Sequence, residues 1–258
     1  MQQLRRLVGR RSARLADGVC VVEGAKVLGE ALDAGRRVEG LYVVAGCADP
    51  VIDRALQLGI RVYDLAPGVM EKVADTVTPQ PVMAVVESPV VGLEHLEGAV
   101  RAGGFVVVAV DLRDPGNAGT VIRSAESSGA AGVILTDGSV EATNPKTVRS
   151  SAGALFHVCV VQGGSALDVL TTLGSWGARR WATAARSEGS IDYDRADLVG
   201  STALVMGNEA HGLAEGLTDV VDGYITIPMV GRSESLNVGM ATAVLCFEAA
   251  RQRRPISA

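Results

Sequence analysis

Polar side chains gather in three short segments of the sequence, and each segment directly follows an apolar run. The segments and their polar residues are DPGNAGTVIRSAESSGA (114–130) with Asn117 and Arg123, MGNEAHGL (206–213) with Glu209, and IPMVGRSESLNVGM (227–240) with Ser235 and Asn237. Amide, hydroxyl and guanidinium groups bind anions, and a carboxylate can hold a guanidinium in place. The sequence therefore predicts a polar ligand site built from three separate segments.

Each of these residues also has a purely structural explanation. Asn117 follows the turn sequence Asp-Pro-Gly and can cap a helix, and Arg123 can be an exposed helical residue. Glu209 would lie at a buried strand end, where a carboxylate is rare unless it is paired, and Arg123 is a candidate partner. Ser235 and Asn237 fall in the first turn of the last expected helix, whose exposed N–H groups can bind an anion. Taken singly, the five residues leave both explanations open.

Alternating strands and helices are expected over the second half of the chain. The expected strands are 105–112, 132–136, 157–161, 181–185, 203–207 and 224–229, and the expected helices are 117–128, 144–153, 165–174, 213–221 and 235–251. The run FVVVAVDL at 105–112 is nearly all apolar, as is typical of a strand buried on both faces. This alternation predicts a mainly parallel sheet covered by helices on both faces. Such sheets bind ligands at the carboxyl ends of their strands, where the three polar segments lie.

The first half of the chain has a similar but shorter pattern. The expected strands are 19–24, 38–44, 60–65 and 81–87, and the expected helices are 25–35, 50–59 and a short one at 68–73. A stretch that contains Pro89 and four glycines between positions 92 and 104 follows, and it is the best candidate for a linker. The predicted organisation is an N-terminal α/β domain (1–90), a linker (91–104) and a larger α/β domain (105–258).

Composition excludes several classes of protein. The chain has 258 residues, of which 48% are hydrophobic and 3% aromatic, and this is a globular composition. The four cysteines and three histidines are far apart, so the sequence predicts no metal site and favours free thiols in a reducing cytoplasm. No apolar run is long enough to cross a bilayer or to serve as a signal peptide, so no membrane association is expected.

Nucleotide-binding motifs are absent as well. No two of the 31 glycines are separated by a single residue, so the sequence contains no GxG. This removes the dinucleotide-binding fingerprint of dehydrogenases and the glycine-rich motif of ordinary Rossmann-like methyltransferases. There is also no GxxxxGK[ST], HExxH or GxSxG sequence. The common nucleotide-dependent enzymes are therefore disfavoured.

Charge is distributed unevenly along the chain. The formal net charge is −5, but the first 14 residues contain five arginines and no acid (Arg5, Arg6, Arg10, Arg11 and Arg14). Leu4, Leu7 and Val8 could pack beneath these arginines as one face of a solvated helix. The alternative is an arm that contacts phosphates. The arginines alone leave both interpretations open.

The three polar segments, in this order, resemble the three motifs of the SpoU (TrmH-like) family of RNA 2′-O-ribose methyltransferases, within the SPOUT superfamily. The resemblance covers about 105–253, and NPKTVRSSAGALFHV (144–158) resembles the family's segment between the first two motifs. VVEGAKVLGEALDAG (21–35) is similar to the N-terminal RNA-binding domain of many members, which resembles a ribosomal protein. Because all three motifs occur together, the structural explanations of the single residues lose most of their weight.

The resemblance implies an α/β domain with a deep trefoil knot that binds S-adenosylmethionine (AdoMet) and needs no metal. It places the cofactor against Leu204, Gly207, Ile227, Met229, Leu236 and Asn237, and catalytic roles on Asn117, Arg123, Glu209, Ser235 and Asn237. An arginine is a poor base because its pKa lies above about 12, so Arg123 is expected to orient the ribose hydroxyl or a neighbouring phosphate. Gly239 stands where many members have Ser or Ala, which predicts close packing at that point of the helix.

The resemblance also implies partners. The substrate would be RNA, ribosomal (23S) RNA more than tRNA, bound by the arginines of the first 14 residues together with Arg149 and Arg232. Members pair through the knotted domain, and a small apolar helical face at Ala241, Val244, Leu245 and Ala249 suits either that contact or core packing. The alternatives are a tRNA 2′-O-methyltransferase and a non-catalytic RNA-binding or ribosome-assembly relative.

Overall fold

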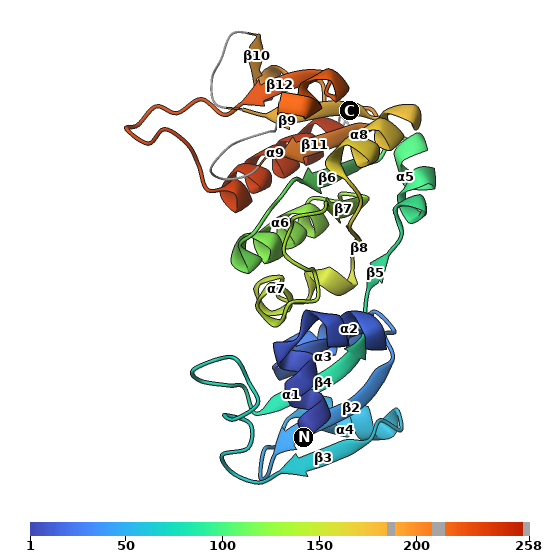
Figure 1. The fold of residues 1–258 in the computed structure, drawn as a ribbon, viewed down its shortest axis with the longest axis vertical. Helices are drawn as coiled ribbons and strands as arrows, with labels where there is room; N and C mark the ends of the chain where they lie inside the picture. The colour runs from blue at the N-terminus through green and yellow to red at the C-terminus, as the bar shows by residue number, and fades with distance from the viewer. Residues whose placement is uncertain (185–188, 208–214, 255–258) are drawn as a thin grey trace.

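The computed structural model describes residues 1–184, 189–207 and 215–254, which fold around two separate β-sheets (Figure 1). The first sheet has the strand order β1-β4-β2-β3 and the second has the order β10-β12-β9-β11-β6-β7-β8-β5. We call residues 1–87 the N-terminal part and residues 88–254 the C-terminal part. Among the described helices, none is both long and apolar enough to cross a membrane.

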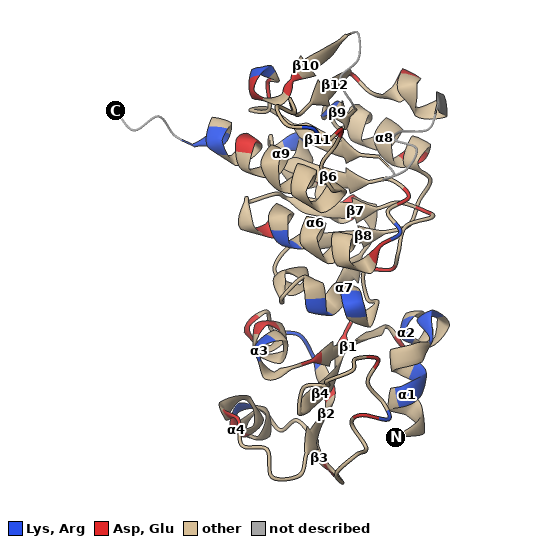
Figure 2. Ribbon diagram, turned by 90° about the vertical axis from the view of Figure 1, so that its left-hand side faces the viewer, with Lys and Arg blue, Asp and Glu red and all other residues tan. Residues whose placement is uncertain are grey.

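The N-terminal part is a three-layer α/β unit. Its elements are α1 (Gln2–Gly9), α2 (Arg11–Asp17), β1 (Val19–Glu23), α3 (Ala25–Asp33), β2 (Val38–Val44), α4 (Pro50–Gln57), β3 (Val62–Leu65) and β4 (Val82–Glu87). Figure 2 shows α1 and α2 on one side of the sheet and α3 and α4 on the other. Apolar residues alternate between these two layers, as Val21 and Met83 face α1 while Val22 and Ala84 face α3. The region 68–73, expected as a short helix, forms turns instead.

The basic N-terminal segment is a pair of short packed helices. Leu4 and Leu7 are buried against the sheet, so the amphipathic pattern of the sequence is satisfied inside this part. Arg5 and Arg10 remain exposed on the outer surface. The packing of Leu4 and Leu7 confirms the solvated-helix interpretation, and contact of the exposed arginines with phosphates stays a prediction.

The C-terminal part contains the second sheet, all of whose strand pairs are parallel. Its strands are β5 (Val90–Val91), β6 (Phe105–Ala109), β7 (Gly132–Leu135), β8 (Cys159–Gln162), β9 (Arg179–Thr183), β10 (Ser190–Asp192), β11 (Thr202–Met206) and β12 (Gly223–Thr226). Its α-helices are α5 (Glu97–Arg101), α6 (Pro115–Ser127), α7 (Pro145–Ser150), α8 (Ala166–Ser175) and α9 (Val238–Arg253), and its 3₁₀ turns are Leu93–Leu96, Ala154–Phe156, Tyr193–Arg195 and Glu215–Val220.

Helices cover both faces of this sheet, as the strand–helix alternation predicts. Residues of α6 and α9 pack on the face that carries Val107 and Leu204, whereas residues of α5 and α8 pack on the face that carries Val106 and Ala203. The central strands β6 and β11 are buried along their whole length. The carboxyl ends of the parallel strands therefore meet at one edge of the sheet, which α6 and α9 approach with their N-termini (Figure 1).

The segment 91–104, expected as a linker, is part of the C-terminal part. β5 pairs with β8, and a 3₁₀ turn and α5 follow it directly. Leu96 and Val100 are buried in the core on one face of the large sheet. Pro89, Gly92, Gly103 and Gly104 lie between these elements, whereas Gly98 lies within α5.

Charged side chains join the two parts of the molecule. Arg14 of α2 donates through Nε to Glu141 Oε1 at 2.5 Å, and both side chains are almost fully buried. Arg149 of α7 contacts Glu23 Oε2 at 3.1 Å and Asp75 Oδ1 at 2.7 Å. His157 Nε2 lies 2.9 Å from Glu30 Oε2. In addition, one apolar core continues from the N-terminal sheet into the C-terminal part.

Candidate active site

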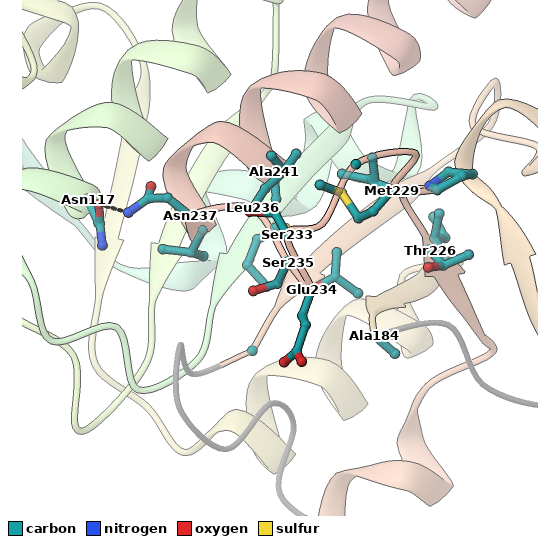
Figure 3. Close-up of a pocket in the computed structure, with 18 residues that line it drawn as sticks. Asn117, Ala184, Thr226, Met229, Ser233, Glu234, Ser235, Leu236, Asn237 and Ala241 are labelled. Carbon is teal, nitrogen blue, oxygen red and sulfur yellow. Dashed lines mark hydrogen bonds between the residues drawn. The ribbon is translucent and has the colours of Figure 1, made fainter.

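A cavity of about 750 Å³ lies at the carboxyl ends of β9, β11 and β12, beside the N-terminus of α9. Figure 3 shows Asn117 and Asn237 facing each other at one end of it, and Thr226 and Met229 at the other. The predicted site residues that line the cavity are Asn117, Gly207, Ile227, Met229, Ser235, Leu236 and Asn237. The structure thus brings together residues that are as much as 120 positions apart in the sequence.

Some residues of the cavity wall were not predicted. Thr183 ends β9 and Ala184 follows it, Thr226 ends β12, and Glu234 lies in the loop before α9. The ends of β9 and β12 could have been found from the general rule that ligands bind at the carboxyl ends of parallel strands. The sequence holds no specific signal for them, because small and apolar residues are common at such positions.

The prediction for Leu204 is wrong. Its side chain is completely buried in the core beneath α6 and α9, and it does not line the cavity. Leu204 lies two residues before the end of β11, inside the sheet, where its backbone pairs with Val107 and Trp181. The cavity is lined instead by Met206 and Gly207, at and beyond the strand end.

Asp114, rather than Asn117, caps helix α6. The Asp114 side chain accepts a hydrogen bond from Asn117 N at 2.8 Å, and Pro115 occupies the first helical position. Proline is favoured there because its missing N–H is not needed in the first turn. The Asn117 side chain is therefore not the cap of α6, and its Oδ1 accepts a hydrogen bond from Asn237 Nδ2 at 2.9 Å.

Asn237 is the residue that joins the two helices. Its Oδ1 accepts from Gly239 N at 2.9 Å and so caps α9, while its Nδ2 donates to Asn117 on α6. Helix α9 begins at Val238, so Ser235 is an exposed residue of the preceding loop and not part of the first helical turn. The sequence-based start of the helix at 235 was three residues too early.

The close packing predicted at Gly239 is confirmed. A Cβ atom on this residue would lie 2.9 Å from Cγ2 and 3.0 Å from Cβ of Thr120 on α6. Atoms of real side chains do not approach so closely, so only glycine allows α6 and α9 to meet at this distance. The contact fixes the N-terminus of α9 against the helix that carries Asn117.

Arg123 is exposed and lies away from this cavity. It lines a smaller cavity of about 260 Å³ at the junction of the two parts, together with Lys26, Glu30 and His157. Six residues of an α-helix correspond to about 600° of rotation, so the side chains of Asn117 and Arg123 leave different faces of α6. Its expected partner Glu209 lies outside the described residues.

The arginines expected to bind RNA fall into three groups. Arg5, Arg10 and Arg232 are exposed with no ion pair among the described residues. Arg6 and Arg11 are exposed but contact Asp17 and Glu141, respectively, and Arg149 is partly buried between two carboxylates. The prediction that Arg14 binds RNA is wrong, because its side chain is only 4% exposed. Its guanidinium donates hydrogen bonds to the Glu141 carboxylate and to the carbonyls of Leu7 and Val8.

The four apolar residues of α9 that suited either a subunit contact or core packing lie mainly toward the core. Leu245 and Ala249 are buried in the core, and Ala241 and Val244 are partly buried. Met240 and Phe247 are instead exposed to 62% and 48%. Among the described residues, no three His, Cys, Asp or Glu side chains gather as metal ligands would.

Two family models match the chain and together span most of it. Residues 104–247 match the SpoU rRNA methylase family, and residues 1–84 match the MRM3-like substrate binding domain. The first match covers the large sheet and the cavity, and the second covers nearly all of the N-terminal part. The division between the two matches thus agrees with the division between the two sheets.

Relatives and solved structures of similar length match across both parts. The chain is 31% identical to the Bacillus subtilis 23S rRNA (guanosine(2553)-2′-O)-methyltransferase RlmP over 92% of this chain and 90% of that protein. It is 31% identical to a 23S rRNA (uridine(2479)-2′-O)-methyltransferase of Streptomyces viridochromogenes over 98% and 89%. The crystal structure of the SpoU methyltransferase AviRb from that species, in complex with AdoMet, superposes with a TM-score of 0.86 at 29% identity, over 98% of this chain and 97% of AviRb. The three-motif resemblance is confirmed, and this chain belongs to the SpoU rRNA methylase family.

Proposed function

We propose that this chain transfers a methyl group from AdoMet to a ribose 2′-hydroxyl of ribosomal RNA. The observation that carries the proposal is the cavity at the strand ends, which the paired amides of Asn117 and Asn237 close at one end. The similar proteins named above act on 23S rRNA and match this chain over both parts. We therefore prefer ribosomal RNA, 23S in particular, to tRNA as the substrate.

The cavity has the size and chemistry that AdoMet requires. Its volume of about 750 Å³ lies within the range of roughly 300–1,000 Å³ that is common for small-molecule sites. Met206, Ile225 and Ile227 supply apolar walls, and the backbone that follows β11 at Gly207 can be approached closely because it carries no side chain. When bound, AdoMet supplies a methyl group on a sulfonium sulfur, which is a good leaving group.

The residues of the chain must then align the ribose 2′-hydroxyl with the methyl group and allow the hydroxyl proton to leave. We infer that the Asn117–Asn237 pair and Ser235 hold the nucleotide at the mouth of the cavity, because all three side chains line it. Arg123 would contact an RNA phosphate, because it is exposed at the junction of the two parts beside Lys26. Proper alignment alone is worth several orders of magnitude in rate.

RNA contact would be local rather than spread over the surface. Arg5, Arg10 and Arg11 are exposed on the N-terminal part, and Arg232 lies in the loop beside the cavity. Because each arginine that contacts a phosphate releases counterions, we expect an affinity that falls as salt rises, although the chain as a whole carries −5. A ribosomal RNA substrate implies a cytoplasmic enzyme, and the four free cysteines are consistent with this location.

We also propose that the protein is a homodimer whose C-terminal parts pair through α9. Met240 and Phe247 lie seven residues apart, so both extend from the same side of the helix, and large exposed apolar residues at such spacing suit an interface. The trefoil knot implied by the family resemblance stays a prediction.

Substitution of the exposed phenylalanine tests the dimer. Phe247→Glu should convert the protein to a monomer in sedimentation equilibrium, because a buried unpaired carboxylate is costly. Leu167→Glu on α8, a residue exposed to a similar degree, is the matched control and should leave the mass unchanged. A wild-type protein that sediments as a monomer would contradict the proposal.

The proposed activity is tested by ribose-methylation mapping and by calorimetry. Ribosomal RNA from cells without the protein should lack one 2′-O-methyl group that the wild-type gene restores, whereas tRNA should be unchanged. The purified protein should bind AdoMet, which a non-catalytic relative of the family would fail to do.

Arg123→Ala should keep AdoMet binding and lose most of the methyl transfer. Normal transfer by this variant would show that Arg123 has no role in the reaction.

A further inference from the structure

We propose that Tyr42, Tyr63 and Arg61, on the N-terminal part, form a stacking site for an unpaired nucleobase of the RNA substrate. This inference rests on the proposed function, since it assigns a contact to the same RNA. The site lies on β2 and the edge strand β3, which pair in parallel with Tyr42 opposite Tyr63. We call these three residues the tyrosine platform.

The two rings of the tyrosine platform are stacked on each other. The centroids of the two rings are 5.0 Å apart and their planes differ by 15°. Arg61 Nη1 lies 3.4 Å from Tyr63 Oη, at the rim of the stack. A Cβ atom on Gly40 would lie 3.2 Å from Tyr63 Cε2, so the rings lean across a strand position that has no side chain.

Exposure distinguishes these rings from ordinary core aromatics. Tyr63 is 38% exposed, and Tyr42 is partly buried against the cluster that holds Leu4 and Leu7 of α1. The platform therefore shares a face of the sheet with the helix that presents the exposed Arg5. The chain has only four tyrosines, and two of them are placed together at this open edge.

This chemistry matches single-stranded RNA. Unpaired bases stack on exposed tyrosine rings and on arginine planes, while nearby cations contact the flanking phosphates. A base in a duplex is already stacked on both sides and cannot use such a site. The cross-strand pair also supports the pairing of β2 with β3, but this role does not require an open ring face or an arginine at its rim.

The test is the affinity of the full-length protein for a short single-stranded RNA that contains 2-aminopurine, compared with the same RNA annealed to its complement. Tyr63→Ala and Tyr63→Leu should each weaken single-strand binding by about fivefold or more and remove the fluorescence quenching of the probe. Tyr63→Phe should retain both. Leu56→Ala on α4, an exposed apolar residue on the opposite face of the same sheet, is the matched control and should bind like the wild type.

Several outcomes would overturn the inference. The first is single-strand affinity within about twofold of the wild type in both Tyr63→Ala and Tyr63→Leu. The others are a loss of single-strand affinity in Tyr63→Phe or in Leu56→Ala as large as that in Tyr63→Ala, and a loss of duplex affinity in Tyr63→Ala as large as its loss of single-strand affinity. Thermal unfolding and AdoMet binding of each variant show that the fold is intact. Because the readout is RNA affinity and not methyl transfer, failure of the proposed enzymatic function would appear separately, as absent AdoMet binding by the wild type.

Discussion

Asn237 performs two tasks with the two ends of one amide group. Its oxygen caps α9 and its nitrogen holds the side chain of Asn117. A serine or an aspartate could cap the helix as well, but an ionised carboxylate has no proton to donate, and a hydroxyl would have to accept and donate at a single atom. The motif sequence indicates that asparagine matters at this position, whereas only the structure shows why.

Two substitutions separate these tasks. Asn237→Asp should keep the cap and the thermal stability but lose the donor to Asn117, and methyl transfer should fall about 10- to 100-fold because the nucleotide is misaligned. Asn237→Ala should lose both interactions and about 1 kcal/mol of stability as well. Calorimetric unfolding and single-turnover rates measure the two effects. Equal activity of Asn237→Asp and wild type would show that the amide pair has no role in transfer.

At the scale of elements, the site depends on how closely α6 and α9 approach each other. Glycine in a helix is unfavourable by about 1 kcal/mol relative to alanine, so its presence near the start of α9 needs a compensating contact. Gly239 provides one by lying against Thr120. The sequence correctly indicates close packing at this position, but the identity of the neighbour comes from the tertiary structure.

Alanine substitutions at two helical glycines should therefore have opposite effects. Gly239→Ala should lower the free energy of unfolding by about 1–3 kcal/mol through overpacking and should weaken AdoMet binding. Gly29→Ala in α3 is the control, since no atom lies within 4 Å of its added Cβ, and it should be stabilising by up to about 1 kcal/mol. Chemical denaturation measures both. A stable Gly239→Ala protein with normal cofactor affinity would contradict the packing argument.

The start of β12 is held to β9 by a pH-dependent contact. Asp222 accepts hydrogen bonds from the backbone N, Nε and Nη2 of Arg180 at 2.7–2.8 Å, and these bonds lower the pKa of its carboxyl below the ordinary value. A lowered pKa means that the stabilisation is present at neutral pH. It is lost below about pH 4, as the pH falls through the pKa of the folded state.

Asp222→Asn should consequently lower the melting temperature at pH 7 and make its decline in acid shallower. The loss should be about 1 kcal/mol, because the pair is partly solvent-exposed. Asp219→Asn, at an exposed position in the preceding 3₁₀ turn, should change neither quantity. Scanning calorimetry between pH 3 and about pH 7 provides the comparison. An unchanged acid dependence in Asp222→Asn would rule out this contact as a source of stability.

At the scale of the whole molecule, the arginines of the first 14 residues have divided roles. Arg14 turns inward and binds Glu141 of the C-terminal part, whose Oε1 also accepts from Thr143 Oγ1 at 2.6 Å. Arg10 stays exposed on the surface. Arg14 thus joins the two parts of the molecule, whereas Arg10, only four residues earlier, lies on the surface expected to contact RNA.

Substitution of each arginine by alanine should show this division. Arg14→Ala should cost about 3 kcal/mol of stability because it leaves the buried Glu141 carboxylate with only the exposed guanidinium of Arg11, 3.7 Å away, as its cation. Arg10→Ala should leave stability within about 0.5 kcal/mol but weaken RNA binding and reduce its salt dependence. Thermal unfolding and RNA titrations over a range of salt concentrations measure these effects. An Arg10→Ala variant that binds RNA with unchanged affinity and salt slope would show that α1 and α2 do not contact the substrate.

Local patterns along the chain determine much of this protein by themselves. The limits of β2 follow from a short run rich in β-branched and aromatic residues, the parallel sheet follows from the strand–helix order, and the family follows from three motifs in sequence order. Each of these depends on residues that are neighbours along the chain. The tertiary structure decided the burial of Arg14, the exposure of Phe247, the packing of 91–104 against the large sheet and the separation of Arg123 from Asn117. These depend on which distant segments meet, and the pattern of apolar residues along one segment carries no information about the surface that will cover it.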